Sequence, residues 1–416
     1  MISSTALDAL LTHPERGTPA WWAQIQAEGT PLVAPSGVPG ECRVVFVWRD
    51  PRGARPEGEA GQVFIEVCSH TPHPRDALTA LQPWPGTDVW YWETRLPANW
   101  CGSYFLVPVG ADALPPPQVP AQRRAWWRAR LERGAVADPL NLWQSYANPA
   151  GQPLSGLRLG QPPQQAAPLR GALRSWRWLS PLLGNRRRVW CYTPPCPTGV
   201  PDGPRPLVIL LDGQVWAAGE GASLPLLADL DRLSAAGVLA PACYLCIDSL
   251  SPGARSHEMG CTPAFWDAVR AELLPRVAQL QALRPGQVWL VGQSLGGLAA
   301  IYGALHWPQA FCGALAQSGA FWWPDVEGGP TSAWLARQLD AGLLPPAGQR
   351  LLIQVGHHDQ PDMRAGSRRL AQSLQARGHI CTFEEFSGGH DWLCWHQALV
   401  AGLPRLLPAA HPIPTF

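Results

Sequence analysis

The sequence predicts an α/β protein of two domains, an N-terminal antiparallel β-sandwich and a C-terminal domain with a mostly parallel sheet. Three observations carry this prediction. Strand-like segments follow one another without a helix between Glu41 and Val109. Apolar strands and helices alternate along the chain after Gly171. A G-x-S-x-G pentapeptide lies between one of these strands and the helix after it.

The N-terminal domain is predicted over residues 1–150. A short helix begins at Pro19, a residue favoured in the first helical turn, and ends at Gly29. Four segments rich in β-branched and aromatic residues follow, separated by Gly, Pro and Asp clusters as in a small antiparallel sandwich. These segments are Cys42–Arg49, Gln62–Cys68, Val89–Leu96 and Gly102–Val109.

Residues 151–171 are predicted to form a linker. The composition changes there to Gln, Pro, Gly and Ala, and the stretch Gln161-Pro-Pro-Gln-Gln is too polar for a core. The C-terminal domain is therefore assigned to residues 172–416.

Continuous apolar runs predict that the strands of the C-terminal domain are buried on both faces of a parallel sheet. Such runs are 188–193, 207–211, 242–248, 287–291, 311–316, 351–355 and 380–386. Helical stretches lie between them, at 265–280, 295–306, 363–377 and 392–407. This alternation places helices on both faces of the sheet.

Composition and charge argue against several classes of function. The chain has 416 residues, of which 46% are hydrophobic and 15% are charged, and its net charge is +1. No strong field steers it to nucleic acid or to a membrane surface, so we expect neither as a partner. All 32 basic residues are arginines, and there are 22 tryptophans. Guanidinium groups stack on rings and pair with anions, so an aromatic, anionic ligand would suit this composition.

Cysteine usage and the first residues predict a cytoplasmic protein. The 11 cysteines are an odd number scattered through strand-like runs, as expected for reduced core thiols. Cys243 and Cys246 form a C-x-x-C, but positions three apart on a strand face opposite sides, which favours core thiols over a redox site. The chain begins without a basic, apolar leader, and no apolar run reaches the roughly 18 residues of a membrane span.

The strongest chemical signal is the pentapeptide Gly292-Gln-Ser294-Leu-Gly296. A sharp strand-to-helix turn lifts a serine hydroxyl out of the sheet, and flanking glycines let the backbones approach closely. We therefore predict that Ser294 is a nucleophile and that the domain is an α/β-hydrolase. The N–H of Leu295 is a predicted oxyanion-hole donor, which would hold the negative oxygen of a tetrahedral intermediate.

A serine nucleophile needs an acid and a base, which follow it in that order in this fold. His390 lies after two glycines behind the last predicted strand and is the predicted base. Asp359 and Asp362 both follow the penultimate strand. Asp359 comes first and is the predicted acid, whereas Asp362 suits the N-cap of the next helix. A metal held by Asp359 with the neighbouring His357 and His358 is not predicted, because adjacent residues rarely converge on one ion.

A second oxyanion donor is expected from the loop after the strand at 207–211. The turn Asp212-Gly213-Gln214 would deliver the backbone N–H of Gln214. The other interpretation is an ordinary strand-end turn in which Asp212 satisfies local amides.

Four further residues are candidates for substrate binding. Arg255 and His257 follow a strand at the end of the sheet where ligands bind, and they would supply a cation for an anionic substrate or form a structural ion pair. Trp322 and Trp323 would form an aromatic wall if exposed and part of the core if buried.

Longer motifs resemble the enterochelin esterase family over nearly the whole chain. In the second domain they include Asp212-Gly-Gln-Val-Trp, Arg255-Ser-His-Glu, Gln317-Ser-Gly-Ala-Phe-Trp-Trp and Gly388-Gly-His-Asp-Trp-Leu-Cys-Trp. In the first domain they include Val45-Phe-Val-Trp-Arg and Gly86-Thr-Asp-Val-Trp. Motifs of this length, in the same order, are far more specific than G-x-S-x-G.

The resemblance implies a cytoplasmic serine esterase that opens the trilactone backbone of a ferric catecholate siderophore resembling enterobactin and helps to release iron. Ser294 would be its nucleophile and His390 its base. The family motif has a glutamate near Asp359, so the aspartate here keeps the charge on a shorter side chain. No cofactor is expected, since iron would enter only as part of the small-molecule substrate.

Two other functions fit parts of the sequence, and the oligomeric state is open. A general carboxylesterase or acyltransferase acting on another aryl or acyl ester would share the fold and the triad. A binding protein without turnover would share the pocket, but the presence of every triad member argues against it.

Overall fold

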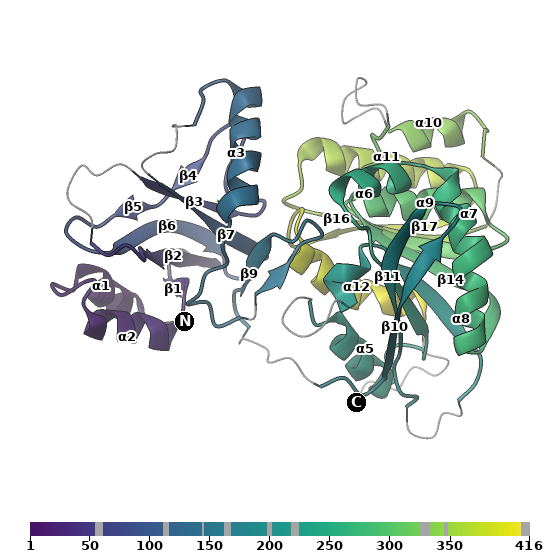
Figure 1. Cartoon of the computed structure of the whole chain (residues 1–416), viewed down its shortest axis with the longest axis horizontal. Coiled ribbons are helices and arrows are strands. Elements are labelled where there is room, and N and C mark those ends of the chain that lie inside the picture. The colour runs from purple at the N-terminus through teal and green to yellow at the C-terminus, as the bar shows by residue number, and fades with distance from the viewer. Residues whose placement is uncertain are drawn as a thin grey trace. The chain divides into compact units, whose positions relative to one another are not determined.

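The structure is a computed structural model that describes residues 1–54, 61–110, 116–143, 145–161, 168–197, 202–217, 224–324, 333–344 and 348–408 (Figure 1). The chain divides into two compact units. The first comprises Met1–Gln165 and Asp391–Leu393, and the second comprises Ala166–His390 and Cys394–Phe416. Within the described ranges, no helix combines the length and the apolar character needed to span a membrane.

The first unit contains two antiparallel sheets, as the sequence predicts. One has the order β1-β2-β6-β5, and the other has the order β4-β3-β7-β9-β8. The strands of the first sheet are β1 (Leu32–Pro35), β2 (Glu41–Arg49), β5 (Gln82–Pro83) and β6 (Val89–Pro97). Those of the second are β3 (Gln62–Val67), β4 (Thr79–Ala80), β7 (Cys101–Val109), β8 (Tyr146–Ala147) and β9 (Pro153–Arg158).

Strand β2 is apolar on both faces because both faces are covered. Its even-numbered residues Val44 and Phe46 belong to the core between the two sheets. Val45 points the other way and packs in a separate cluster with Trp21 and Ile25 of helix α2 (Pro19–Glu28). Helix α1 (Ser4–Thr12) contributes to the same cluster.

Two elements of this unit differ from the sequence prediction. Strand β9 lies within residues 151–171, the predicted linker, and pairs antiparallel with β7. Its Leu154 and Leu157 are buried, and the surrounding Gln and Pro residues conceal this short apolar segment in the sequence. Helix α3 (Pro120–Gly134) has no counterpart among the predicted helices, because Trp127 is its one buried residue and it lacks an apolar stripe.

The second unit is built on one eight-stranded sheet, in the order β10-β11-β13-β12-β14-β15-β16-β17. The pairs β10–β11 and β11–β13 are antiparallel, and all other pairs are parallel, which confirms the predicted mostly parallel sheet. The strands are β10 (Ala172–Ser180), β11 (Asn185–Thr193), β12 (Arg205–Leu210), β13 (Cys243–Ile247), β14 (Leu283–Gln293), β15 (Gly313–Gln317), β16 (Arg350–Gly356) and β17 (Ile380–Phe386).

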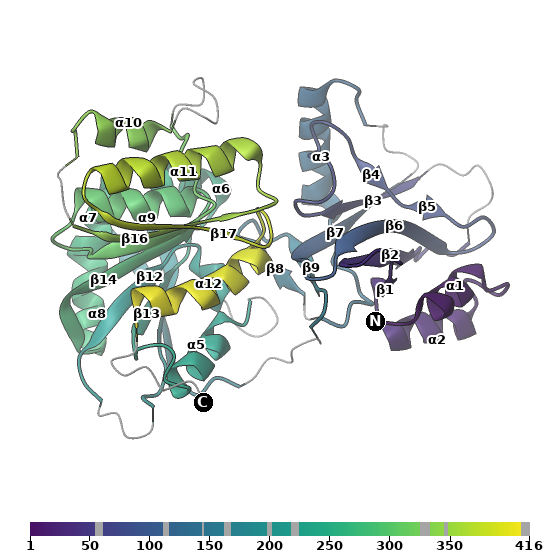
Figure 2. The same cartoon turned by 180° about the vertical axis from the view of Figure 1, so that it is seen from behind.

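Helices cover both faces of this sheet. Figures 1 and 2 show α9 (Leu295–His306) and α11 (Pro361–Ala376) on one face and α5 (Leu226–Ala235) and α12 (Trp392–Leu406) on the other. The predicted helix at 265–280 is observed as α7 (Pro263–Ala268), a π-helical turn (Val269–Leu273) and α8 (Leu274–Leu280). The remaining helices are α4 (Gly213–Ala217), α6 (Pro252–Met259) and α10 (Trp334–Asp340).

A buried ion pair fixes α6 against strand β11. Arg187 and Glu258 are 1% and 3% exposed, and the Arg187 guanidinium donates to both carboxylate oxygens of Glu258. The same guanidinium lies over the rings of Trp178 and Phe265, at 5.4 and 5.8 Å from their centroids. Helix α6 is thereby held beside the carboxyl end of the parallel strands.

The two edge strands of this sheet carry opposite charges. Strand β10 at one edge bears the exposed Arg174 and Arg177. Strand β17 at the other edge bears Glu385, which forms ion pairs with Arg368 at 2.7 Å and Arg364 at 3.3 Å.

Candidate active site

Ser294 lies on a sharp turn between strand β14 and helix α9. Its backbone has φ 55° and ψ −119°, a left-handed conformation that is strained for a residue with a side chain. The turn depends on glycine, because a Cβ on Gly292 would lie 2.1 Å from the carbonyl oxygen of Gly296. A Cβ on Gly297 would likewise lie 3.2 Å from the carbonyl oxygen of Gly292, so glycines lie at the two positions where backbone meets backbone.

The structure brings Ser294, His390 and Asp359 into one hydrogen-bonded chain. The Nε2 atom of His390 lies 3.1 Å from the Oγ of Ser294, and its Nδ1 lies 3.1 Å from Oδ1 of Asp359. The Asp359 carboxylate is fully buried, whereas 36% of the His390 side chain is exposed. Asp362, the other candidate acid, lies in the first turn of α11, and Gln360 takes the N-cap position expected for it because Pro361 begins the helix.

Ser318 and Trp395, which the sequence prediction missed, complete the surroundings of Asp359. Oδ2 of Asp359 accepts hydrogen bonds from the hydroxyl of Ser318 at 2.6 Å and from the backbone N–H of Gly356 at 2.8 Å. The indole Nε1 of Trp395 donates to Ser318 Oγ at 2.9 Å. Both residues lie within motifs that resemble the enterochelin esterases, which is the one signal that singles them out.

A row of buried glutamines crosses three neighbouring strands and begins directly before Ser294. Gln293, Gln317 and Gln354 occupy matched positions on strands β14, β15 and β16, and they are at most 3% exposed. We call them the glutamine ladder. Gln293 Nε2 donates to Gln317 Oε1 at 3.0 Å, and Gln317 Nε2 donates to Gln354 Oε1 at 2.9 Å. Gln317 also donates to the backbone carbonyl of Trp395 at 3.0 Å, which ties the ladder to helix α12.

The two predicted oxyanion donors lie in the first turns of helices, where backbone N–H groups have no intrahelical acceptor. Leu295 is the first residue of α9, and Gln214 is the second residue of α4. The turn before α4 lies against the nucleophile turn, since a Cβ on Gly296 would lie 3.5 Å from Asp212 Oδ2. The amide side chain of Gln214 is fixed by hydrogen bonds with Ser249.

Arg255 forms the structural ion pair that the sequence left open. It donates from Nε and Nη2 to the two carboxylate oxygens of Asp212, each at 2.8 Å, and from Nη2 to the carbonyl of Gln293 at 3.1 Å. Burial lowers the pKa of Arg255, but the charge and hydrogen bonds of Asp212 outweigh this and raise it above its usual value. The guanidinium therefore connects the β12–α4 turn to Gln293, the residue before Ser294.

The other predicted substrate contacts lie on the same unit. His257 is exposed on helix α6, near Arg255. Trp322 and Trp323 are half-buried and pack edge to face at 5.9 Å, and the Trp323 indole donates to the carbonyl of Gly260 at 3.3 Å. They are neither the fully exposed wall nor the fully buried core that the sequence allowed.

The two histidines beside the acid point to solvent. His357 and His358 are exposed, and Nδ1 of His357 lies 3.3 Å from Oε2 of Glu385. Across the described part of the chain, no group of three or more His, Cys, Asp and Glu side chains is arranged to hold a metal ion.

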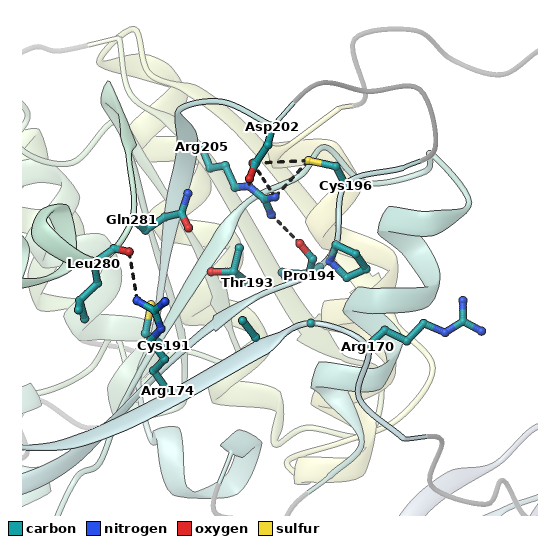
Figure 3. A pocket seen from close by; sticks show the side chains of 13 residues that line it. Arg170, Arg174, Cys191, Thr193, Pro194, Cys196, Asp202, Arg205, Leu280 and Gln281 are labelled. Carbon is teal, nitrogen blue, oxygen red and sulfur yellow. Dashed lines mark hydrogen bonds and ion pairs between the residues drawn. The ribbon is translucent and has the colours of Figure 1, made fainter.

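A separate cavity of about 390 Å³ lies at the opposite end of the sheet (Figure 3). Arg205, one of its lining residues, begins strand β12, whereas Ser294 follows the end of the parallel strand β14. Two of the arginines that line this cavity, Arg205 and Arg174, already have acceptors. Arg205 donates to the carbonyl of Pro194 at 2.6 Å and to Asp202 at 2.9 Å, and Arg174 donates to the carbonyl of Leu280 at 3.3 Å.

An α/β-hydrolase domain with a Ser–His–Asp hydrogen-bonded chain at the carboxyl end of its parallel strands defines a serine hydrolase. Residues 43–167 match the family described as the N-terminal domain of enterochelin esterase, and residues 180–406 match the putative esterase family.

Curated relatives narrow this class. The chain is 37% identical to the iron(III) enterobactin esterase of Dickeya dadantii (strain 3937), over 97% of this chain and 96% of the relative. It is also 37% identical to that of Escherichia coli (strain K12), over 86% of this chain and 90% of the relative. The chain therefore belongs to the enterobactin esterase family.

A solved structure supports the same assignment. The enterobactin esterase from Shigella flexneri, crystallised in the presence of enterobactin, matches with a TM-score of 0.81 and 34% identity. The match covers 94% of this chain and 98% of that one.

Proposed function

We propose that this protein is a serine esterase that hydrolyses the ester bonds of the trilactone backbone of a ferric catecholate siderophore of the enterobactin type. The observation that carries the proposal is the chain of hydrogen bonds from Ser294 through His390 to Asp359, in a protein of the enterobactin esterase family. Hydrolysis of the backbone would help to release the iron.

The geometry supports a two-step acyl transfer. When a neutral imidazole donates from Nδ1 to Asp359, the lone pair of Nε2 accepts the proton of Ser294 as the hydroxyl attacks an ester carbonyl. The backbone N–H groups of Leu295 and Gln214 would hold the oxyanion, and His390 would return the proton to the leaving alcohol. Water activated by the same imidazole then releases the acyl group.

The chain's own residues suffice for this reaction, so we propose that it uses no cofactor and that iron is carried only by the substrate. Arg255, His257, Trp322 and Trp323 remain the proposed substrate contacts. Arg255 would act mainly by holding Asp212, since its hydrogen bonds go to that carboxylate and to a backbone carbonyl.

We also propose that the enzyme works in the cytoplasm. All 11 cysteines are free thiols. Reduced cysteines are typical of the cytoplasm, where glutathione and thioredoxin keep thiols reduced.

The test is mass-resolved product analysis of purified protein given ferric and iron-free enterobactin. We expect linear dihydroxybenzoyl-serine products from the unaltered protein and a loss on the order of 10⁶-fold in kcat for Ser294→Ala. The matched control is Ser175→Ala, the same change on the exposed side of edge strand β10. This control should retain full activity.

Two results would overturn the proposal in different ways. If the trilactone survives while a simple aryl ester is cleaved in a Ser294-dependent manner, the hydrolase stands and the siderophore assignment falls. If Ser294→Ala retains activity on every ester, the nucleophile assignment falls as well.

A further inference from the structure

Ser318 lies at the end of strand β15, between the nucleophile and the acid. It is fully buried, and its backbone has φ 45°. The residues beside it hold Ser294 on both sides, because Ser294 N–H donates to the carbonyl of Gln317 at 2.9 Å and Ala320 N–H donates to the carbonyl of Ser294 at 3.0 Å. The N–H of Ser318 itself donates to the carbonyl of Gln354 at 2.7 Å. This short segment is therefore fastened to both the nucleophile turn and the neighbouring strand.

The direction of the Ser318 hydroxyl is fixed by its two partners. An indole N–H can only donate, so the hydrogen bond from Trp395 Nε1 occupies a lone pair of Ser318 Oγ. The single hydroxyl proton is then left for Oδ2 of Asp359, 2.6 Å away. A hydroxyl oriented in this way stabilises the carboxylate and not the protonated acid.

This arrangement determines which carboxylate oxygen meets the imidazole. Oδ2 of Asp359 is occupied by Ser318 and by the N–H of Gly356, so Oδ1 faces Nδ1 of His390. Trp395 acts on the imidazole as well, since its ring lies edge to face with His390 at 4.7 Å and 80°. One tryptophan thus contacts the base directly and reaches the acid through Ser318.

We propose that Ser318 and Trp395 are positioning residues of the triad, which hold the Asp359 carboxylate in one rotamer and set how strongly it attracts the proton on His390. The inference rests on the proposed function, because it concerns the same nucleophile and base. It adds two residues to the machinery that activates Ser294, and both act through the carboxylate of Asp359 or the ring of His390.

Loss of the hydroxyl has two expected effects. In Ser318→Ala the carboxylate keeps one donor on Oδ2 and can rotate, so Ser294 should react about 10- to 100-fold more slowly, as expected for a misplacement of about 1 Å. The carboxylate charge is also less dispersed, so it attracts the imidazolium more strongly. The acid limb of the pH–rate profile, which reports protonation of His390, should therefore move to higher pH.

The assay follows phosphonylation of Ser294 by a fluorophosphonate probe as a function of pH. The Ser294 Oγ–P bond forms, the P–F bond breaks, and the serine proton leaves through His390 with the fluoride. The probe needs no siderophore. If the unaltered protein is not labelled, the proposed function fails, whereas labelling of the unaltered protein makes the test of Ser318 independent of the substrate.

Matched controls separate positioning from packing. Ser367→Ala in helix α11 removes another fully buried hydroxyl, one with no hydrogen-bond partner among the described residues. Trp395→Phe removes the indole N–H but keeps an aromatic ring, and Trp289→Phe makes the same change where Nε1 has no partner in the described chain. We expect slower labelling and a shifted acid limb for Ser318→Ala and Trp395→Phe. The controls Ser367→Ala and Trp289→Phe should show neither effect.

Equal labelling rates for Ser318→Ala and Ser367→Ala would overturn the inference. Slower labelling with an unmoved acid limb and a lowered melting temperature would also overturn it, because that pattern belongs to a purely structural residue. If Ser318→Ala does not fold, Trp395→Phe decides by the same two criteria.

Discussion

Replacing Gln317 by leucine would break the glutamine ladder at its middle member. The change removes hydrogen bonds to Gln293, Gln354 and the carbonyl of Trp395. It leaves the Nε2 of Gln293 and the Oε1 of Gln354 buried without these partners. An unsatisfied buried polar group costs about 1–3 kcal/mol, so the two groups together should lower the free energy of unfolding by about 2–6 kcal/mol.

Urea unfolding measures this change in the C-terminal domain if fluorophosphonate labelling of Ser294 is used as the probe of the folded state. With a denaturant slope of about 1–3 kcal/mol/M, the expected loss lowers the midpoint by on the order of 1 M or more. The matched control is Gln349→Leu. Gln349 is also buried, but among the described residues its side-chain amide makes a single long hydrogen bond of 3.4 Å, to the carbonyl of Phe311.

Equal shifts of the midpoint for Gln317→Leu and Gln349→Leu would refute a stabilising role of the ladder. So would a loss of less than about 1 kcal/mol in the free energy of unfolding of Gln317→Leu at an unchanged slope. Either result would mean that the apolar contacts of leucine replace what the ladder contributes. The energetic role given to the three aligned amides would then be wrong.

Three further predictions follow from single contacts. Gly292→Ala should abolish labelling of Ser294, because its Cβ would lie 2.1 Å from a backbone carbonyl oxygen. Gly253→Ala should leave the labelling unchanged, because a Cβ at that position meets nothing within 4 Å. Equal labelling of the two variants would contradict this. Burial lowers the pKa of His379 in the folded protein, so the unfolded chain binds a proton on this imidazole more tightly than the folded chain does. The free energy of unfolding should therefore fall as the pH falls below about 6.5. His379→Leu should reduce that loss in urea titrations from about pH 8 to about pH 5.5, and an equal loss in both proteins would assign it to another group. Arg187→Met should lower the free energy of unfolding, measured by urea, by about 3–5 kcal/mol, because it leaves the Glu258 carboxylate buried without its ion pair. Adding Glu258→Leu should recover part of this loss. If the double variant recovers none of it, the energetic role given to the ion pair is wrong.

Local pattern is enough to predict the elements that carry Ser294, His390 and Asp359. Ser294 is recognisable because glycines flank it between a strand and a helix, and His390 because it follows the last strand after two glycines. Sequence order also favours Asp359 over Asp362 as the acid, and the structure places Asp359 beside the imidazole. These signals are short-range, so they survive without any knowledge of how the strands pair.

The contacts that depend on strand register have no such short-range signal in the sequence. Ser318 reaches Asp359 only because β15 lies beside β16 in a fixed register, and the two residues are 41 positions apart. Arg255 reaches Asp212 from 43 positions away, and nothing in its motif distinguishes a substrate-binding cation from an ion pair. Arg187, in a run of three arginines that suggests a solvated segment, is buried because Glu258 meets it from another element.

The opposite charges on the edges of the C-terminal sheet have a consequence for self-association. A second copy that added its own β10 to the exposed β10 would bring Arg174 and Arg177 of both copies together, and like charges opposed across strands are destabilising. At the other edge, the carboxylate of Glu385 is already paired within its own chain. Pairing of two β10 edges, a route by which open sheets aggregate, is thus disfavoured. Salt screens the repulsion between arginines, so the protein should resist aggregation best at low ionic strength.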